Sequence, residues 1–158
     1  MITIYTDGAA KGNPGRGGYG TVLLAEVNGK VYRKELAEGY RNTTNNRMEL
    51  LAVIRGLQML KKEGSVVTVY SDSKYVVEAV EKGWIWNWQK QGFKKKKNVD
   101  LWQAFIPLYK KHQVKFKWVK GHAGIPENER CDELAVNAAE SGNLKIDEGY
   151  ENQGTSLF

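Results

Sequence analysis

The chain is poor in cysteine: Cys131 is the only one among 158 residues, so no disulfide can form within one chain. A protein without disulfides is typical of a reducing compartment. The sequence also lacks an apolar run long enough to cross a bilayer, which argues against a membrane protein. Its first residues carry no basic stretch followed by an apolar one, so we expect no secretory signal peptide. These absences predict a soluble, cytoplasmic protein with no membrane partner.

The composition predicts one normally packed domain with a basic surface. Hydrophobic residues make up 41% of the 158-residue chain, which is enough for an ordinary core. The 24 Lys and Arg residues outnumber the 18 Asp and Glu residues, for a formal net charge of +6. A moderate positive excess suits an anionic partner but does not identify one. The sequence shows no internal repeat and no second domain, and we expect a monomer.

The pattern of apolar residues predicts an α/β fold. We expect strands over residues 2–6, 18–27, 30–38, 65–71 and 114–119, and helices over residues 45–62, 73–82, 100–111 and 126–140. Asn28-Gly29 is a hairpin signal, so the strands on either side of it should be antiparallel. This order predicts a mixed five-stranded sheet, with three antiparallel strands followed by parallel ones, flanked by helices.

Two stretches are expected to lie outside regular structure. The segment from Gly8 to Gly20 is rich in glycine and is interpreted as a connection between the first two strands. Residues 143–158 are polar, and we expect them to form a frayed C-terminal tail after a domain that spans residues 1–142.

Two short motifs resemble each other and each follows a predicted strand. They are Tyr5-Thr6-Asp7-Gly8 and Tyr70-Ser71-Asp72-Ser73. If the two strands lie in parallel, both aspartates reach the carboxyl edge of the sheet, where α/β proteins build their sites. Two carboxylates held that close repel each other unless a cation or a proton lies between them. A divalent metal site is the first hypothesis, and a turn or a helix cap is the ordinary alternative for either aspartate alone.

Longer motifs follow in a characteristic order along residues 1–142. They are Thr6-Asp7-Gly8, Gly12-Asn13-Pro14-Gly15, Thr44-Asn45-Asn46-Arg47-Met48-Glu49-Leu50, Asp72-Ser73-Lys74-Tyr75-Val76, Asn98-Val99-Asp100-Leu101-Trp102, Trp118-Val119-Lys120-Gly121-His122-Ala123-Gly124 and Glu129-Arg130-Cys131-Asp132-Glu133-Leu134-Ala135. Together they resemble the type 1 ribonuclease H family in its bacterial form. The resemblance implies a ribonuclease H-like fold and an endonuclease that cleaves the RNA strand of RNA–DNA hybrids, leaving 5′-phosphate and 3′-hydroxyl ends.

The resemblance also implies a set of catalytic residues. It assigns Asp7, Glu49, Asp72 and Asp132 as acidic metal ligands and His122 as a mobile histidine of the site. Two Mg²⁺ ions roughly 3.5–4 Å apart, or Mn²⁺ in their place, can activate water, clamp the phosphate and assist the leaving oxygen. Mg²⁺ prefers hard oxygen ligands, which fits carboxylates. Taken singly, a helical glutamate is usually a solvated surface residue, and a lone histidine is usually structural.

A dense basic run predicts where the hybrid is held. Lys94, Lys95, Lys96 and Lys97 follow a segment that contains Trp84, Trp88 and Phe93. Aromatic residues beside lysines suit a nucleic-acid backbone that runs over a hydrophobic floor. In the family this region is a basic protrusion that grips the DNA strand, and here it is short. The alternative is a core-facing tryptophan pair beside a solvated run of charge.

Short polar side chains are the candidates for telling the two strands apart. RNA differs from DNA by its 2′-hydroxyl, and amides can both donate to it and accept from it. The resemblance implies that Asn13, Asn45 and Asn46 read the RNA strand, and that Thr44 and Asn98 form a phosphate pocket for the DNA strand. Apart from the resemblance, the local sequence indicates that Asn13 is a turn residue and that Asn45 is a helix cap.

The sequence departs from familiar bacterial members at three positions near these motifs. Asn42 occupies the place of an arginine often associated with the phosphate pocket, and Lys74 and Ile125 replace a glutamine and a histidine. None of these changes touches the acidic residues. Two other functions compete with the endonuclease: a hybrid-binding protein that does not cleave, and another nuclease of the same superfold.

Overall fold

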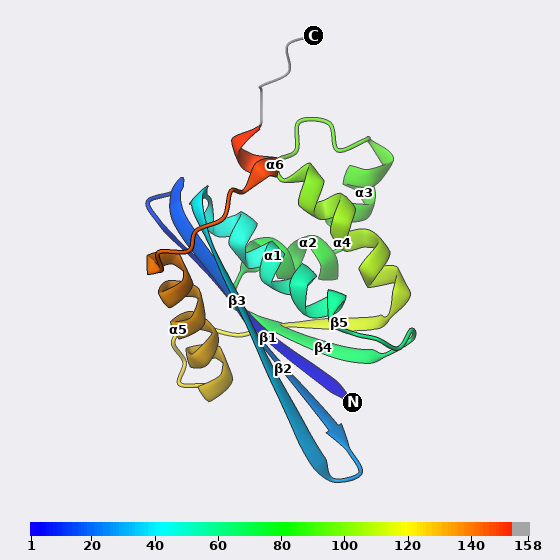
Figure 1. Ribbon diagram of the computed structural model, residues 1–158. Helices are drawn as coiled ribbons and strands as arrows, with labels where there is room; N and C mark the ends of the chain where they lie inside the picture. The colour runs from blue at the N-terminus through cyan, green and yellow to red at the C-terminus, as the bar shows by residue number, and fades with distance from the viewer. Residues whose placement is uncertain (153–158) are drawn as a thin grey trace.

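The computed structural model describes residues 1–152, which form a five-stranded sheet with helices on both faces (Figure 1). The strands are β1 (Ile2–Lys11), β2 (Gly15–Val27), β3 (Lys30–Thr43), β4 (Val66–Ser71) and β5 (Gln113–Trp118), in the sheet order β3-β2-β1-β4-β5. Strands β1, β2 and β3 pair antiparallel, whereas β4 pairs parallel with β1 and with β5. The predicted mixed sheet is therefore confirmed.

The helices divide between the two faces of the sheet. They are α1 (Asn45–Gln58), α2 (Lys74–Glu81), α3 (Trp84–Lys90), α4 (Val99–Lys111), α5 (Pro126–Glu140) and α6 (Glu148–Glu151). Figure 1 shows α5 alone on one face, with α1, α2 and α4 on the other. The main core lies on the latter side, where Ile4, Met48, Val69, Trp102 and Phe105 are fully buried. No helix of the described residues is long and apolar enough to cross a membrane.

The first two strands are longer than the sequence pattern predicted. The glycine-rich stretch after Asp7 is largely strand, since β1 continues to Lys11 and β2 begins at Gly15. The connection predicted from Gly8 to Gly20 is wrong for this reason. Glycine is required at this end of the strands because helices pack closely against the strand backbone. A Cβ on Gly8 would lie 2.5 Å from the backbone nitrogen of Glu49 on α1. A Cβ on Gly20 would overlap the carbonyl oxygen of Cys131 on α5.

Asp7 consequently lies within β1 and not at its end. Its partner is Gly20 of the antiparallel β2, whereas parallel pairing with β4 stops two residues earlier, at Tyr5 and Tyr70. Beyond that register β1 and β4 no longer pair. Asp7 and Asp72 therefore both follow the point where the two strands separate.

Helices differ from the predicted set in extent and in number. Helix α1 ends at Gln58, before the predicted end at residue 62, and the tryptophan-rich segment forms an additional short helix, α3. Helix α6 lies within the stretch that the polar composition marked as a frayed tail. In that stretch Lys145 N–H donates to the carbonyl of Gly39 at 2.8 Å, and Asp147 is only 7% exposed. The described part of the stretch is thus packed against the domain, while residues 153–158 lie outside the described residues.

Candidate active site

Three carboxylates meet where β1 and β4 separate. Asp7 comes from β1, Asp72 follows β4, and Glu49 lies in the first turns of α1. Each contributes one oxygen to a group in which all three atoms lie within 4.8 Å of one another. The start of α1 is set by Thr44, whose hydroxyl accepts from the N–H of Arg47 at 3.3 Å as an N-cap. This cap, together with the close approach at Gly8, brings Glu49 over the strand.

One backbone group links two of the acids. The N–H of Gly8 donates to Asp7 Oδ1 and to Glu49 Oε1, both at 2.8 Å. The other oxygen of Glu49, Oε2, is buried and has no hydrogen-bond partner among the described residues. A buried carboxylate oxygen without a partner is costly unless a cation or a proton compensates it. The acidic triad of Asp7, Glu49 and Asp72 therefore fits a bound metal ion.

The electrostatics of the triad lead to the same conclusion. Burial raises the pKa of Asp7 to about 7, and the neighbouring Asp72 adds to the shift. Burial, followed by repulsion from Asp7, raises the pKa of Glu49 well above its usual value. Burial also raises the pKa of Asp72. Three acids that resist ionisation together bind protons or a divalent cation in preference to standing as free anions.

Asp132 and His122 lie at the same site but outside the triad. Both line a groove of about 460 Å³ with Asp7, Glu49 and Asp72. Asp132 projects from α5, on the other face of the sheet from α1. The backbone of His122 is left-handed, with φ of 56°, in an exposed loop. The structure thus gathers all five residues that the sequence predicted as catalytic around one groove.

A second pocket adjoins the groove. It has a volume of about 360 Å³ and is lined by Asn13, Pro14, Thr44, Asn46, Lys97, Asn98 and Tyr150. Asn46 lines both hollows, and Asn45 lines the groove. Asn13 is held in place because its Oδ1 accepts from the N–H of Asn45 at 3.1 Å. The asparagines and Thr44 that the sequence predicted to contact substrate therefore lie beside the carboxylates.

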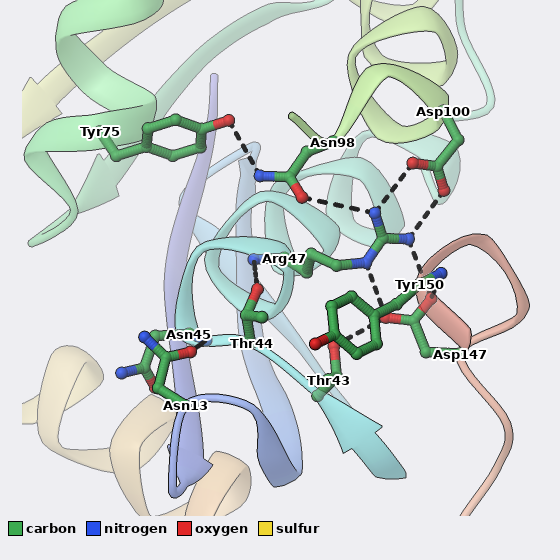
Figure 2. Close-up of polar contacts among 10 residues, drawn as sticks. All are labelled: Asn13, Thr43, Thr44, Asn45, Arg47, Tyr75, Asn98, Asp100, Asp147 and Tyr150. Atoms are coloured by element: carbon green, nitrogen blue, oxygen red, sulfur yellow. Dashed lines mark hydrogen bonds and ion pairs between the residues drawn. The ribbon is translucent and has the colours of Figure 1, made fainter. Parts of the chain in front are cut away.

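A buried ion network stands behind the second pocket (Figure 2). The Arg47 side chain is 1% exposed and donates to both oxygens of Asp100, at 2.8 and 2.7 Å. It also donates to both oxygens of Asp147, at 2.8 and 2.9 Å. The hydroxyl of Thr43 donates to Asp147 at 2.7 Å. The sequence did not predict this network, because no local pattern marks Asp147 as the partner of a residue 100 positions earlier.

The aromatic and basic segment has a mixed environment. Trp84 is 42% exposed, whereas Trp88 is half-buried and packs edge-on against Trp102. Phe93 is 7% exposed and belongs to the core, so it anchors the start of the lysine run and does not offer an open surface. The four lysines that follow are exposed, and Lys96 Nζ lies 4.9 Å from the centre of the Trp88 ring.

Lys74 also lines the groove beside the acidic triad. Its ammonium group lies 5.1 Å from the centre of the Trp118 ring. The indole N–H of Trp118 in turn donates to the backbone carbonyl of Asp72 at 3.0 Å. The positively charged Lys74 side chain is therefore held at the edge of an otherwise acidic site.

Sequence comparisons find relatives of this chain along most of its length. A profile of the RNase H family matches residues 1–140. Ribonuclease H of Desulforamulus reducens is 56% identical over 151 residues, which cover 92% of each chain. Ribonuclease HI of Synechocystis sp. is 49% identical over 154 residues, which cover 94% of each chain.

Solved structures give the same result. LC9-RNase H1, a type 1 RNase H with the type 2 active-site motif, has a TM-score of 0.79 at 30% identity and covers 99% of this chain and 81% of its own. LC11-RNase H1, solved in complex with an RNA/DNA hybrid, has a TM-score of 0.63 at 29% identity over 89% of this chain and 97% of its own. Because the family profile spans all four carboxylates, and because relatives share about half of their residues along almost the whole chain, this chain belongs to the RNase H family.

Proposed function

We propose that this protein is an endonuclease that hydrolyses the RNA strand of RNA–DNA hybrids and leaves 5′-phosphate and 3′-hydroxyl ends. The observation that carries the proposal is the acidic triad, with its unpartnered buried Glu49 oxygen, at the base of an open groove. A groove lined by clustered negative charge is of no use to a protein that only binds phosphates, but it suits one that binds cations and cleaves beside them.

Two Mg²⁺ ions are the proposed cofactors, with Mn²⁺ as a substitute. Asp7, Glu49 and Asp72 would hold one ion, and Asp7 and Asp132 would hold the other, because their oxygens are the hard ligands that Mg²⁺ prefers. When bound, such ions supply a nucleophilic water near neutral pH and neutralise charge on the phosphate. The buried unpartnered oxygen of Glu49 supports this assignment.

Other polar residues are proposed to position the hybrid. Asn13, Asn45 and Asn46 are proposed to contact 2′-hydroxyls of the RNA strand, since amides satisfy a group that both donates and accepts. Thr44 and Asn98 are proposed to hold a phosphate of the DNA strand in the second pocket. This division places the RNA strand over the carboxylates and the DNA strand beside them.

The basic segment is proposed to extend the contact along the DNA strand. Lys94–Lys97 form an exposed run next to the second pocket, since Lys97 itself lines that pocket. Trp84 supplies an exposed aromatic surface, while Phe93 and Trp88 pack on the core and anchor the segment there. We propose that the protein acts as a monomer in the cytoplasm.

One assay separates this function from its alternatives. Labelled RNA–DNA hybrid, RNA duplex and DNA duplex are each incubated with the protein, with and without Mg²⁺. We expect Mg²⁺-dependent cleavage of the RNA strand of the hybrid alone. Binding of the hybrid without cleavage would identify a binding protein, and cleavage of the DNA duplex would identify another nuclease of the same superfold.

His122→Ala should slow turnover and leave measurable activity. The imidazole lies on an exposed left-handed residue beside the groove, where it can accept a proton or assist product release. A group in that role contributes on the order of 10²–10⁴-fold at most, because the charge stabilisation comes from elsewhere in the site. Single-turnover and steady-state rates on the hybrid measure the loss. A loss as complete as that caused by Asp7→Asn would assign His122 a structural or ligand role instead.

Replacing Lys94–Lys97 by Ala should raise KM for the hybrid and leave kcat nearly unchanged. Each phosphate contact releases counterions, so affinity falls with a slope of about 0.9 per contact on a log–log plot against salt. The variant should therefore have a shallower slope. The matched control removes four other exposed lysines, Lys30, Lys34, Lys61 and Lys62, and should leave the slope as in the wild type. Parallel lines for the first variant and the wild type would mean that Lys94–Lys97 are only a solvated surface.

A further inference from the structure

The second pocket has one wall that comes from beyond the region matched by the family profile. That wall is Tyr150 on α6, whereas the profile ends at residue 140. We propose that Tyr150 is a substrate-binding residue whose hydroxyl donates a hydrogen bond to a backbone phosphate of the uncut strand. This inference rests on the proposed function and adds a contact that the motifs do not contain.

The chemistry of the second pocket suits an anion. Among the described residues that line it there is no carboxylate, although four carboxylates line the groove next to it. Its lining residues include Lys97, Thr44 and Tyr150, whose side chains carry an ammonium group and two hydroxyls. Within residues 1–152 the Tyr150 hydroxyl has no hydrogen-bond partner, and the residue bonds to Asp147 through its backbone N–H. The hydroxyl is thus available to a ligand.

Helix α6 is too short to hold this position by itself, and the buried network holds it. Asp147, the N-cap of α6, accepts the backbone N–H of Tyr150 at 3.3 Å through Oδ1. The same carboxylate forms the bidentate pair with Arg47, whose side chain is 1% exposed. A planar guanidinium bound in this way fixes direction as well as distance. Figure 2 shows Tyr150 next to Asp147, with Thr43 and Arg47 behind.

The seating of α6 depends on a glycine. A Cβ on Gly149 would collide with Asp100 Oδ2 and would lie 2.7 Å from Arg47 Nη2. The backbone of α6 therefore lies directly against the ion network. Because Tyr150 is the next residue, its ring is placed by the same contact.

The network also orients a second donor of the pocket. Asn98 Oδ1 accepts from Arg47 Nη1 at 3.5 Å, and its Nδ2 donates to the Tyr75 hydroxyl at 3.0 Å. Tyr75 in turn lines the catalytic groove. Arg47 is accordingly a positioning residue that orders Asn98 and Tyr150 in one pocket, next to the carboxylates.

The test is Tyr150→Phe, which removes only the hydroxyl. We expect KM for the hybrid to rise about ten- to a hundred-fold, as for the loss of one hydrogen bond to a charged group, with kcat and Tm unchanged. The log–log salt slope should match the wild type, because no cation is lost, in contrast to Lys97→Ala. Tyr32→Phe is the matched control, since Tyr32 is exposed on the β2–β3 hairpin, and it should leave KM unchanged.

A second measurement separates this proposal from the proposed function. Binding of the hybrid is measured in the Asp7→Asn background, where cleavage plays no part, with and without Tyr150→Phe. A larger Kd in the double variant supports the contact between Tyr150 and the phosphate, whether or not the wild type cleaves. Equal Kd values, or a KM for Tyr150→Phe equal to that of the wild type, would overturn it. Failure of the wild type to cleave any hybrid would instead overturn the proposed function.

Discussion

Replacing Asp7 by Asn should abolish hybrid cleavage, with kcat/KM reduced by more than the roughly 10⁴-fold that is the upper limit of the loss expected for His122→Ala, because both proposed ions lose a charged ligand. Asp7 shares the Gly8 N–H with Glu49, and one of its oxygens lies within 4.8 Å of an oxygen of each other acid of the triad. It is also the residue proposed to contact both ions. Asparagine keeps the size of the side chain but removes its charge. Cleavage of labelled hybrid at saturating Mg²⁺ measures the loss.

The matched control is Glu133→Gln, on the residue next to Asp132. Its carboxylate is 62% exposed and pairs only with Arg130 among the described residues. The same chemical change at that position should leave activity within about two-fold, because exposed pairs contribute little. Near-normal Mg²⁺-dependent activity of Asp7→Asn would remove Asp7 from the site.

The same substitution should stabilise the metal-free protein at neutral pH. Burial raises the pKa of Asp7 from 3.8 to about 7, so the folded state holds a proton more tightly than the unfolded state does. Stability is therefore highest below the ordinary pKa and falls as pH rises through the window from 3.8 to about 7. Asp7→Asn removes this titration. Urea unfolding in EDTA at several pH values should show a flatter profile for the variant; identical profiles would contradict it.

Arg47→Ala should destabilise the fold by about 3–5 kcal/mol, the usual cost of breaking a buried ion pair from one side. The substitution leaves Asp147, with its side chain 9% exposed, without its cationic partner, and it removes both bonds to Asp100. The result is a buried uncompensated charge together with the loss of the contact that seats α6. Urea unfolding at pH 7 measures the change in free energy.

Arg41→Ala provides the control for that measurement. Arg41 also pairs with a carboxylate of α6, Glu151, but its side chain is 57% exposed. An exposed pair of this kind contributes little to stability, because water screens it. If Arg47→Ala costs no more than Arg41→Ala, the network is not a stabilising element and the anchoring of α6 must be sought in other contacts.

Much of the site could be predicted from short motifs. Asp7 and Asp72 each follow an apolar strand pattern, so their local placement needs no distant contact. The interpretation of Asn45 as the helix cap is wrong by one residue, because Thr44 is the N-cap and Asn45 is the first residue of α1. The order of strands and helices along the chain and the hairpin at Asn28-Gly29 follow from apolar periodicity and turn chemistry in the same way. These features depend on neighbours within one turn or one strand.

Other features depend on close approach between distant segments. The glycines after Asp7 look like a loop in the sequence, yet they extend as strand because α1 and α5 press against them where no side chain intervenes. The close packing of α1 on β1 also buries Glu49 and leaves one of its oxygens without a hydrogen-bond partner. A glutamate in a helical motif does not by itself predict this burial.

The sequence by itself therefore determined the kinds of residues at the site and the elements that carry them. Only the tertiary structure decided that Asp147, within a polar C-terminal stretch, would pair with the buried Arg47 and place Tyr150 in the second pocket. The reason is physical: a charge is buried only where a partner from another part of the chain compensates it, and that partner is defined by packing and not by local pattern.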